Sequence, residues 1–125
     1  MRAPREDYDG AAQAAASIFE AIIKGDSSLC RDSFLEGAVI FGQTDGKPNV
    51  GPYTNLLKQI DGSKVGPEFN YRTDVVAMED TIALVQVLEN NYNGNYYTVY
   101  CTAMKTEGKW KIGSFIYNQN KEPYQ

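Results

Sequence analysis

Hydrophobic and polar positions alternate with a period of two over much of the second half of the chain. Four runs follow this pattern, and polar turns separate them; the runs are residues 69–78, 82–90, 96–105 and 109–118. A period of two is the spacing at which side chains alternate between the two faces of a β-strand. The second half therefore predicts four consecutive strands joined by short turns.

The first half shows helical spacing instead. From Asp9 onward apolar residues recur every three or four positions, and Lys24-Gly25 supplies a basic last turn and a helix-stopping glycine. A short second helix is expected over residues 29–34, a strand over 38–43 with a weak partner strand through Val50, and a third helix after Gly51-Pro52. Three helices followed by a sheet predict one α+β domain over residues 1–125, with the helices covering one sheet face.

The last two predicted strands carry large apolar side chains on both faces. One face, together with the first helix, is expected to form an interior pocket; its residues are Ile18, Ile22, Tyr97, Val99, Cys101, Phe115 and Tyr117. The other face holds Tyr100, Met104, Trp110, Ile112 and Ile116. Because a chain this small has no further element to cover the second face, we expect a homodimer through the outer side of the sheet, with Trp110 or its neighbours at the interface.

The register of these two strands depends on the length of the turn between them. A three-residue turn places Val99 opposite Phe115 and Tyr97 opposite Tyr117, and this is the register we expect. The two tyrosines would then be the only hydroxyls of the pocket. A two-residue turn would place Tyr100 opposite Phe115 instead.

Composition excludes several classes of partner. With 12 basic against 16 acidic residues the net charge is −4, the wrong sign for nucleic acid or an anionic membrane surface. No apolar stretch is long enough to span a membrane, and the start lacks the apolar core of a signal peptide, so a cytoplasmic location is expected. Cys30 and Cys101 fit no metal or redox spacing and are expected to be reduced and buried.

The chain has no histidine, which removes the commonest general base and the commonest metal ligand. No metal or cofactor site is expected, and any catalysis would have to use carboxylates, tyrosines, lysines or cysteines. Asp74 and Glu89 on the predicted strands are the candidate pocket carboxylates. Carboxylates are rarely buried unless they are paired, so the sequence favours solvated charges near the strand ends for both.

Several motifs in a fixed order resemble the putative lumazine-binding family over nearly the whole chain. They are Asp7-Tyr8-Asp9, residues 25–29, Phe34, residues 38–42 and 45–47, Gly51-Pro52, Gly66-Pro67, and residues 108–112. The resemblance implies membership of the nuclear-transport-factor-2-like (NTF2-like) superfamily, with its cystatin-like cone built on a strongly curved mixed or antiparallel sheet. That superfamily also contains ketosteroid isomerase and the SnoaL-type cyclases, together with non-enzymatic proteins.

The family resemblance leaves three functions open. Ketosteroid isomerase needs a carboxylate base and a tyrosine donor, and by local alignment those positions are Gly42 and Ile18. We therefore expect binding of a small, largely apolar or planar molecule in the cone, with no evident catalysis. One alternative is an isomerase, dehydratase or cyclase that uses a pocket carboxylate and Tyr97 or Tyr117. The other is a structural or partner-binding dimer whose cone is filled by its own side chains.

Overall fold

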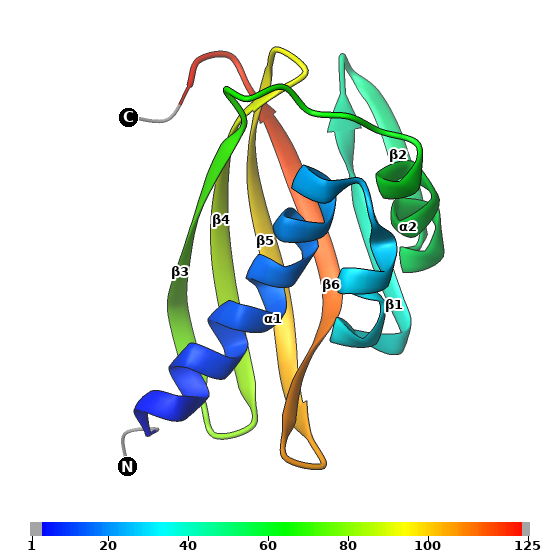
Figure 1. Cartoon of the computed structure of the whole chain (residues 1–125). Helices are drawn as coiled ribbons and strands as arrows, with labels where there is room; N and C mark the ends of the chain where they lie inside the picture. Colours follow the sequence, from blue (N-terminus) through cyan, green and yellow to red (C-terminus); the bar gives the residue numbers. More distant parts are fainter. Residues whose placement is uncertain (1–3, 124–125) are drawn as a thin grey trace.

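The computed structural model describes residues 4–123, in which a curved sheet wraps around two helices (Figure 1). The helices are α1 (Arg5–Lys24) and α2 (Tyr53–Asp61), and two short 3₁₀ turns, η1 (Ser27–Leu29) and η2 (Arg31–Ser33), connect α1 to the first strand. The strands are β1 (Phe34–Thr44), β2 (Lys47–Pro52), β3 (Asn70–Glu79), β4 (Ile82–Tyr92), β5 (Asn95–Thr106) and β6 (Lys109–Asn120).

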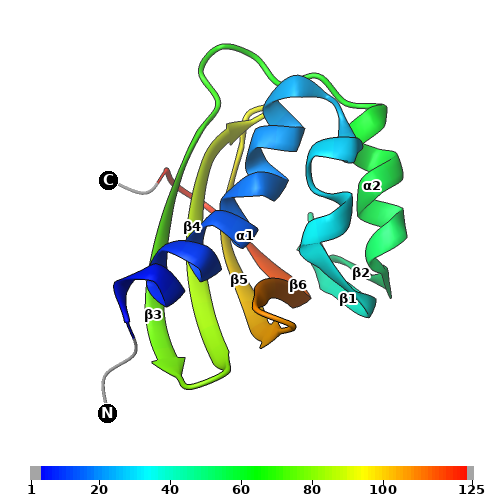
Figure 2. The same ribbon diagram turned by 60° about the horizontal axis from the view of Figure 1, so that its bottom comes forward.

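The six strands form one mixed sheet in the order β2-β1-β6-β5-β4-β3. The pair β1 and β6 is parallel, and the other four neighbouring pairs are antiparallel. Figure 2 shows the sheet curving around α1, which packs against β3 and β6, while α2 packs against β1 and β2. The α+β cone expected from the sequence is therefore confirmed, as is the meander from β3 to β6.

One long helix and one short helix are present where three were predicted. The segment predicted as the second helix forms η1 and η2 instead. Its polar side chains bind nearby groups: the Asp26 carboxylate accepts from the backbone N–H of Ser28 at 3.0 Å, and Ser27 donates from its N–H and its hydroxyl to Asp61. Short polar side chains that bind in this way compete with regular helix formation.

The turn between β5 and β6 has two residues, so the predicted three-residue turn is wrong. Glu107 and Gly108 both adopt positive φ values, 52° and 77°, as a tight hairpin turn requires. A β-bulge then shifts the register between Thr102 and Ala103. Beyond it Val99 pairs with Tyr117 and Cys101 with Phe115, whereas the predicted pairing joined Val99 to Phe115 and Tyr97 to Tyr117.

The bulge decides which side chains of β6 face the helices. It adds one residue to β6, so Trp110 and Ile112 on one side of it and Phe115 on the other all lie on the buried face. The prediction that Trp110 lies on the outer face is therefore wrong. Trp110 is 8% exposed, and its Nε1 donates to Oδ1 of Asp7 on α1 at 3.2 Å.

The buried face holds one continuous core between the helices and the sheet. Cys30 and Cys101 are free and buried within it, as expected from the sequence. Neither helix in residues 4–123 combines the length and the apolar character that crossing a lipid bilayer requires.

Candidate functional site

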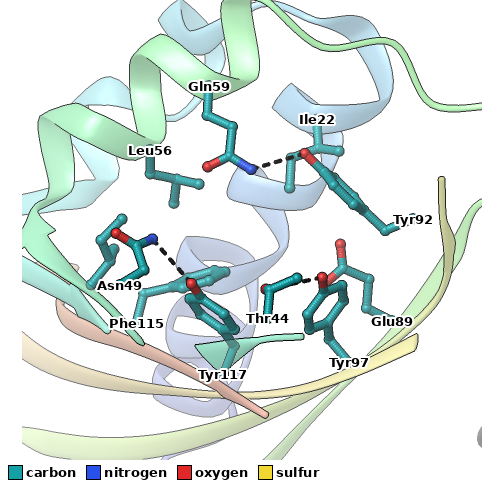
Figure 3. Close-up of a pocket in the computed structure, with 11 residues that line it drawn as sticks. Ile22, Thr44, Asn49, Leu56, Gln59, Glu89, Tyr92, Tyr97, Phe115 and Tyr117 are labelled. Carbon is teal, nitrogen blue, oxygen red and sulfur yellow. Dashed lines mark hydrogen bonds between the residues drawn. The ribbon is translucent and has the colours of Figure 1, made fainter. Parts of the chain in front are cut away.

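A cavity opens at the end of the cone where β4 turns into β5, which we call the cavity end (Figure 3). Its volume is about 70 Å³. Eleven residues line it: Ile22, Ile40, Thr44, Asn49, Leu56, Gln59, Glu89, Tyr92, Tyr97, Phe115 and Tyr117. Typical sites for drug-sized ligands hold about 300–1,000 Å³. The cone is therefore largely filled by its own side chains, and the remaining space holds a small group or several water molecules.

Four of the seven residues predicted for the pocket line the cavity: Ile22, Tyr97, Phe115 and Tyr117. The other three, Ile18, Val99 and Cys101, share the same buried face but are 0% exposed and do not border the cavity. They lie deeper in the core, because Ile18 is one helical turn before Ile22, and Val99 and Cys101 follow Tyr97 along β5. Their assignment to the pocket wall is therefore corrected.

Glu89 is the lining residue whose placement contradicts the sequence interpretation most clearly. It is 5% exposed, although a solvated strand-end charge was expected. The signal was present in the alternation of β4, because Glu89 has the same parity as the fully buried Val85 and Val87. Asp74 fits the expectation of a solvated charge, since its side chain is 38% exposed and pairs with Arg72 at 2.8 Å, but it lies in the middle of β3 and not near a strand end.

Three tyrosine hydroxyls surround the cavity, and each has a hydrogen-bond partner on another element. The Tyr97 hydroxyl lies 3.3 Å from the hydroxyl of Thr44 at the end of β1. The amide of Asn49 on β2 donates to the Tyr117 hydroxyl at 3.0 Å. The prediction that Tyr97 and Tyr117 supply the only pocket hydroxyls is therefore wrong, because Thr44 and Tyr92 add two more.

The direction of these bonds leaves donors free. Gln59 on α2 donates its side-chain N–H to the Tyr92 hydroxyl at 3.3 Å, as Asn49 does to Tyr117. Each of these two phenol oxygens accepts a bond, so each keeps its own O–H proton for another acceptor. The cavity end can therefore offer O–H donors from two sides to the polar atoms of a bound molecule.

The electrostatics of the cavity are governed by burial. Burial raises the pKa of the Glu89 carboxyl to about 8. Burial also raises the pKa of Tyr97, which lies directly opposite Glu89 on the neighbouring strand, and the charge of Glu89 adds to this rise. Within residues 4–123 no side-chain hydrogen bond offsets the effect of burial on the Glu89 carboxyl, and Figure 3 shows it beside Tyr97 and close to Tyr92.

The two positions aligned with the ketosteroid isomerase base and donor carry no acid or base. Ile18 is fully buried in the core. At Gly42 a Cβ atom would lie 2.5 Å from the backbone oxygen of Tyr117 and 2.6 Å from its ring. The absence of a side chain at position 42 therefore allows the Tyr117 ring to lie against β1, where a carboxylate base would not fit.

Comparison with known proteins agrees with this architecture. Residues 6–118 match the family described as "Putative lumazine-binding". A protein of Cladobotryum sp. named aldolase FrzH is 33% identical over 113 residues, which cover 90% of this chain and 90% of that protein.

Solved structures show the same fold. An NTF2-like protein of unknown function from Shewanella baltica matches with a TM-score of 0.83 at 25% identity, covering 98% of this chain and 100% of that one. A second NTF2-like protein of unknown function, from Methylobacillus flagellatus, has a TM-score of 0.85 at 20% identity, with 95% and 96% coverage. The family and fold predicted from the sequence are confirmed: the chain belongs to the "Putative lumazine-binding" family and has the NTF2-like, cystatin-like fold.

Proposed function

We propose that the protein binds a small planar molecule that carries a carbonyl group, with that group held in the cavity. The observation that carries this proposal is the presence of free O–H donors, on Tyr92 and on Tyr117, in a cavity that apolar side chains also line. A carbonyl oxygen is an acceptor that such an O–H group can satisfy. The aromatic walls favour a planar ligand, because ring faces pack against one another at little entropic cost.

The relatives support the same class of ligand. Lumazine, after which the family is named, is a planar bicyclic ring system with two carbonyl groups. The relative from Cladobotryum is named an aldolase, and aldol chemistry joins or splits carbonyl compounds. Both names therefore point to carbonyl compounds as the class of ligand to test first on this chain.

The small volume of the cavity limits the ligand. About 70 Å³ accommodates the carbonyl and part of a ring, so the rest of the molecule would lie at the mouth. The hydrogen bond between Gln59 and Tyr92 at this mouth is exposed to solvent. Breaking an exposed hydrogen bond costs little, because water replaces the lost partner, and its rupture would widen the entrance.

Titration with lumazine, followed by its own fluorescence, tests the proposal. Tyr117→Phe removes one donor and should weaken binding several-fold, since a hydrogen bond contributes about 1 kcal/mol. Tyr100→Phe is the matched control, because that hydroxyl accepts from Gln86 on the outer face of the sheet and should leave binding unchanged. Equal effects of the two substitutions, or no binding by the unmodified protein, would contradict the proposal.

We also propose that two copies associate through the outer face of the sheet in the cytoplasm. A row of apolar side chains crosses four neighbouring strands there: Val50, Phe41, Ile116 and Tyr100 are successive partners in the register. Val50 is 75% exposed and Phe41 is 42% exposed. Contiguous exposed apolar side chains of this kind are typical of interaction surfaces. The two free, buried cysteines are consistent with a reducing compartment.

Sedimentation at micromolar concentration tests the association. The unmodified protein should sediment as a dimer. A stable interface of this kind would bury at least about 1,000 Å² in total. Phe41→Lys should shift it to a monomer, whereas Lys58→Ala on the exposed side of α2 should not. A monomeric unmodified protein at high concentration would contradict the proposal.

A further inference from the structure

The Glu89 carboxyl differs from the other buried carboxyl of the fold in having no partner. Asp7 is 8% exposed, and it accepts hydrogen bonds from Lys105 at 2.8 Å and from Trp110 at 3.2 Å. Glu89 is 5% exposed, and among residues 4–123 no side chain donates a hydrogen bond to its carboxyl, which borders the cavity instead. Burial of an unpaired carboxyl is unfavourable, and an apolar residue would fill the same place at lower free energy.

The position of Glu89 relates the unpaired carboxyl to the proposed ligand. It is the only carboxyl among the eleven lining residues, and it lies directly opposite Tyr97 on the neighbouring strand. Residues directly opposite in an antiparallel pair have Cβ atoms about 4.5–5.5 Å apart. The acid therefore faces the same small space as the hydroxyls that would hold a carbonyl oxygen (Figure 3).

We infer that the site is catalytic and that Glu89 transfers a proton to and from the carbon next to the carbonyl group of the bound molecule. This inference rests on the proposed function, because the Tyr117 hydroxyl must hold the ligand carbonyl for the carbon next to it to face Glu89. The position that aligns with the base of ketosteroid isomerase takes no part, because it is Gly42 and has no side chain.

The step balances without any further reagent. The Glu89 carboxylate takes the proton, so a C–H bond breaks and an O–H bond forms on the carboxyl. The electron pair of the C–H bond moves into the bond between the two carbons, and the carbonyl π electrons move onto oxygen, giving an enolate. The Tyr117 O–H stabilises this oxygen, and its donor strength is increased by the bond that its own oxygen accepts from Asn49. Return of the proton from Glu89 to carbon regenerates the carboxylate.

Burial also suits the carboxyl to this task. An effective general base has a pKa near the working pH, and burial brings the pKa of Glu89 to about 8. An ordinary solvated glutamate, with a pKa of about 4.3, would be a much weaker base. The same burial that makes Glu89 unfavourable for folding therefore makes it more basic.

The test uses 2-indanone, a planar ketone with acidic hydrogens next to its carbonyl group. The full chain is incubated with it in D₂O, and proton NMR follows replacement of these hydrogens by deuterium above the buffer rate. We expect catalysed exchange, which Glu89→Gln lowers by at least about 100-fold. Tyr117→Phe should lower it by about 10-fold or more, since it removes one donor to the enolate oxygen. Asp74→Asn, at a half-exposed carboxylate on β3 that pairs with Arg72 and does not line the cavity, should have no effect.

Binding of 2-indanone is measured alongside, by shifts of its NMR signals on titration. Binding without catalysed exchange, or exchange that Glu89→Gln leaves unchanged, overturns the inference and leaves the proposed function intact. Absence of binding by both 2-indanone and lumazine overturns both. If Glu89→Gln does not fold, Glu89→Asp serves instead: it withdraws the acid by one methylene group and should lower the exchange rate while 2-indanone still binds, and an unchanged rate overturns the inference.

Discussion

Each end of the cone holds a buried carboxyl, and the two carboxyls differ in their hydrogen-bond partners and in the direction of their pKa shifts. At the end where α1 begins, which we call the anchor end, Asp7 bonds to Lys105 and Trp110, and these bonds lower the pKa of Asp7. At the cavity end Glu89 has no such partners, and burial raises its pKa to about 8. Burial alone therefore does not set the charge of a carboxyl; the donors around it do.

The comparison also separates stability from function. The anchor end satisfies its polar groups and packs Trp110 tightly under α1, as a region that holds the fold together should. The cavity end keeps an unpaired acid, free hydroxyl donors and an unfilled space. Such departures from complete pairing are concentrated at functional sites in folded proteins.

The largest expected effect is truncation of the aromatic ring at the anchor end. Trp110→Ala should lower the free energy of unfolding by about 3–5 kcal/mol, because it opens a large void and leaves Asp7 with one donor fewer. Tyr92→Ala at the cavity end should cost clearly less, because that ring is only partly buried. Urea unfolding measures both, and equal losses would show that the two ends do not differ in packing.

Glu89→Gln should have the next largest effect, and it should be stabilising. The folded chain holds the Glu89 proton more tightly than the unfolded chain, whose glutamate pKa is about 4.3. The stability from this group is therefore complete below that pKa and is lost as pH rises through about 8. The free energy of unfolding should fall by at most about 1.4 kcal/mol per pH unit from this carboxyl.

The side chain in Glu89→Gln does not titrate, so the variant lacks this pH dependence of the free energy of unfolding. We expect Glu89→Gln to raise the free energy of unfolding at pH 8 by about 1–3 kcal/mol and to flatten its decline above about pH 5. Asp74→Asn is the control and should change neither, because Asp74 is paired with Arg72 at the surface. A destabilised Glu89→Gln at pH 8 would show that the carboxylate has stabilising partners in the folded state.

Gly10→Ala should destabilise the anchor end by about 1 kcal/mol. Alanine normally favours a helix interior over glycine by about that amount. Here a Cβ at position 10 would lie 2.7 Å from Cδ1 of Trp110, so the ring or the helix must move. Gln13→Ala, at an exposed position of the same helix, should be neutral or slightly stabilising. Thermal unfolding compares the two variants. A Gly10→Ala variant more stable than Gln13→Ala would show that the Trp110 ring does not lie this close to position 10.

The smallest expected effect is that of Asp7→Asn on the stability of the fold at acid pH. The pKa of Asp7 is lowered by its bonds to Lys105 and Trp110, so its stabilisation is present above the unfolded pKa of about 3.9 and is lost as pH falls through the folded value. Lys105 is 36% exposed, and solvent screens such a pair. Acid titration followed by circular dichroism should show a shallower loss of structure in Asp7→Asn, and an unchanged profile would contradict this role.

Local patterns predicted most of the fold. Lys24-Gly25 indicated the end of α1, and Gly25 does adopt the left-handed conformation, with φ 65°. The alternation of β5 also indicated which of its residues face inward. Tyr97, Val99 and Cys101 are all buried, although the pairing predicted for them was wrong.

The sequence by itself determined the first helix, the order of the strands, the family, and the inward face of β5, because these follow from residues close together along the chain. Only the tertiary structure decided the bulge in β6, the inward position of Trp110 and the isolation of Glu89. Each of these depends on which distant side chains lie across the sheet. The alternation along β4 shows that residue 89 faces inward. It does not show whether a donor lies near its carboxyl, as Lys105 lies near Asp7 at the anchor end.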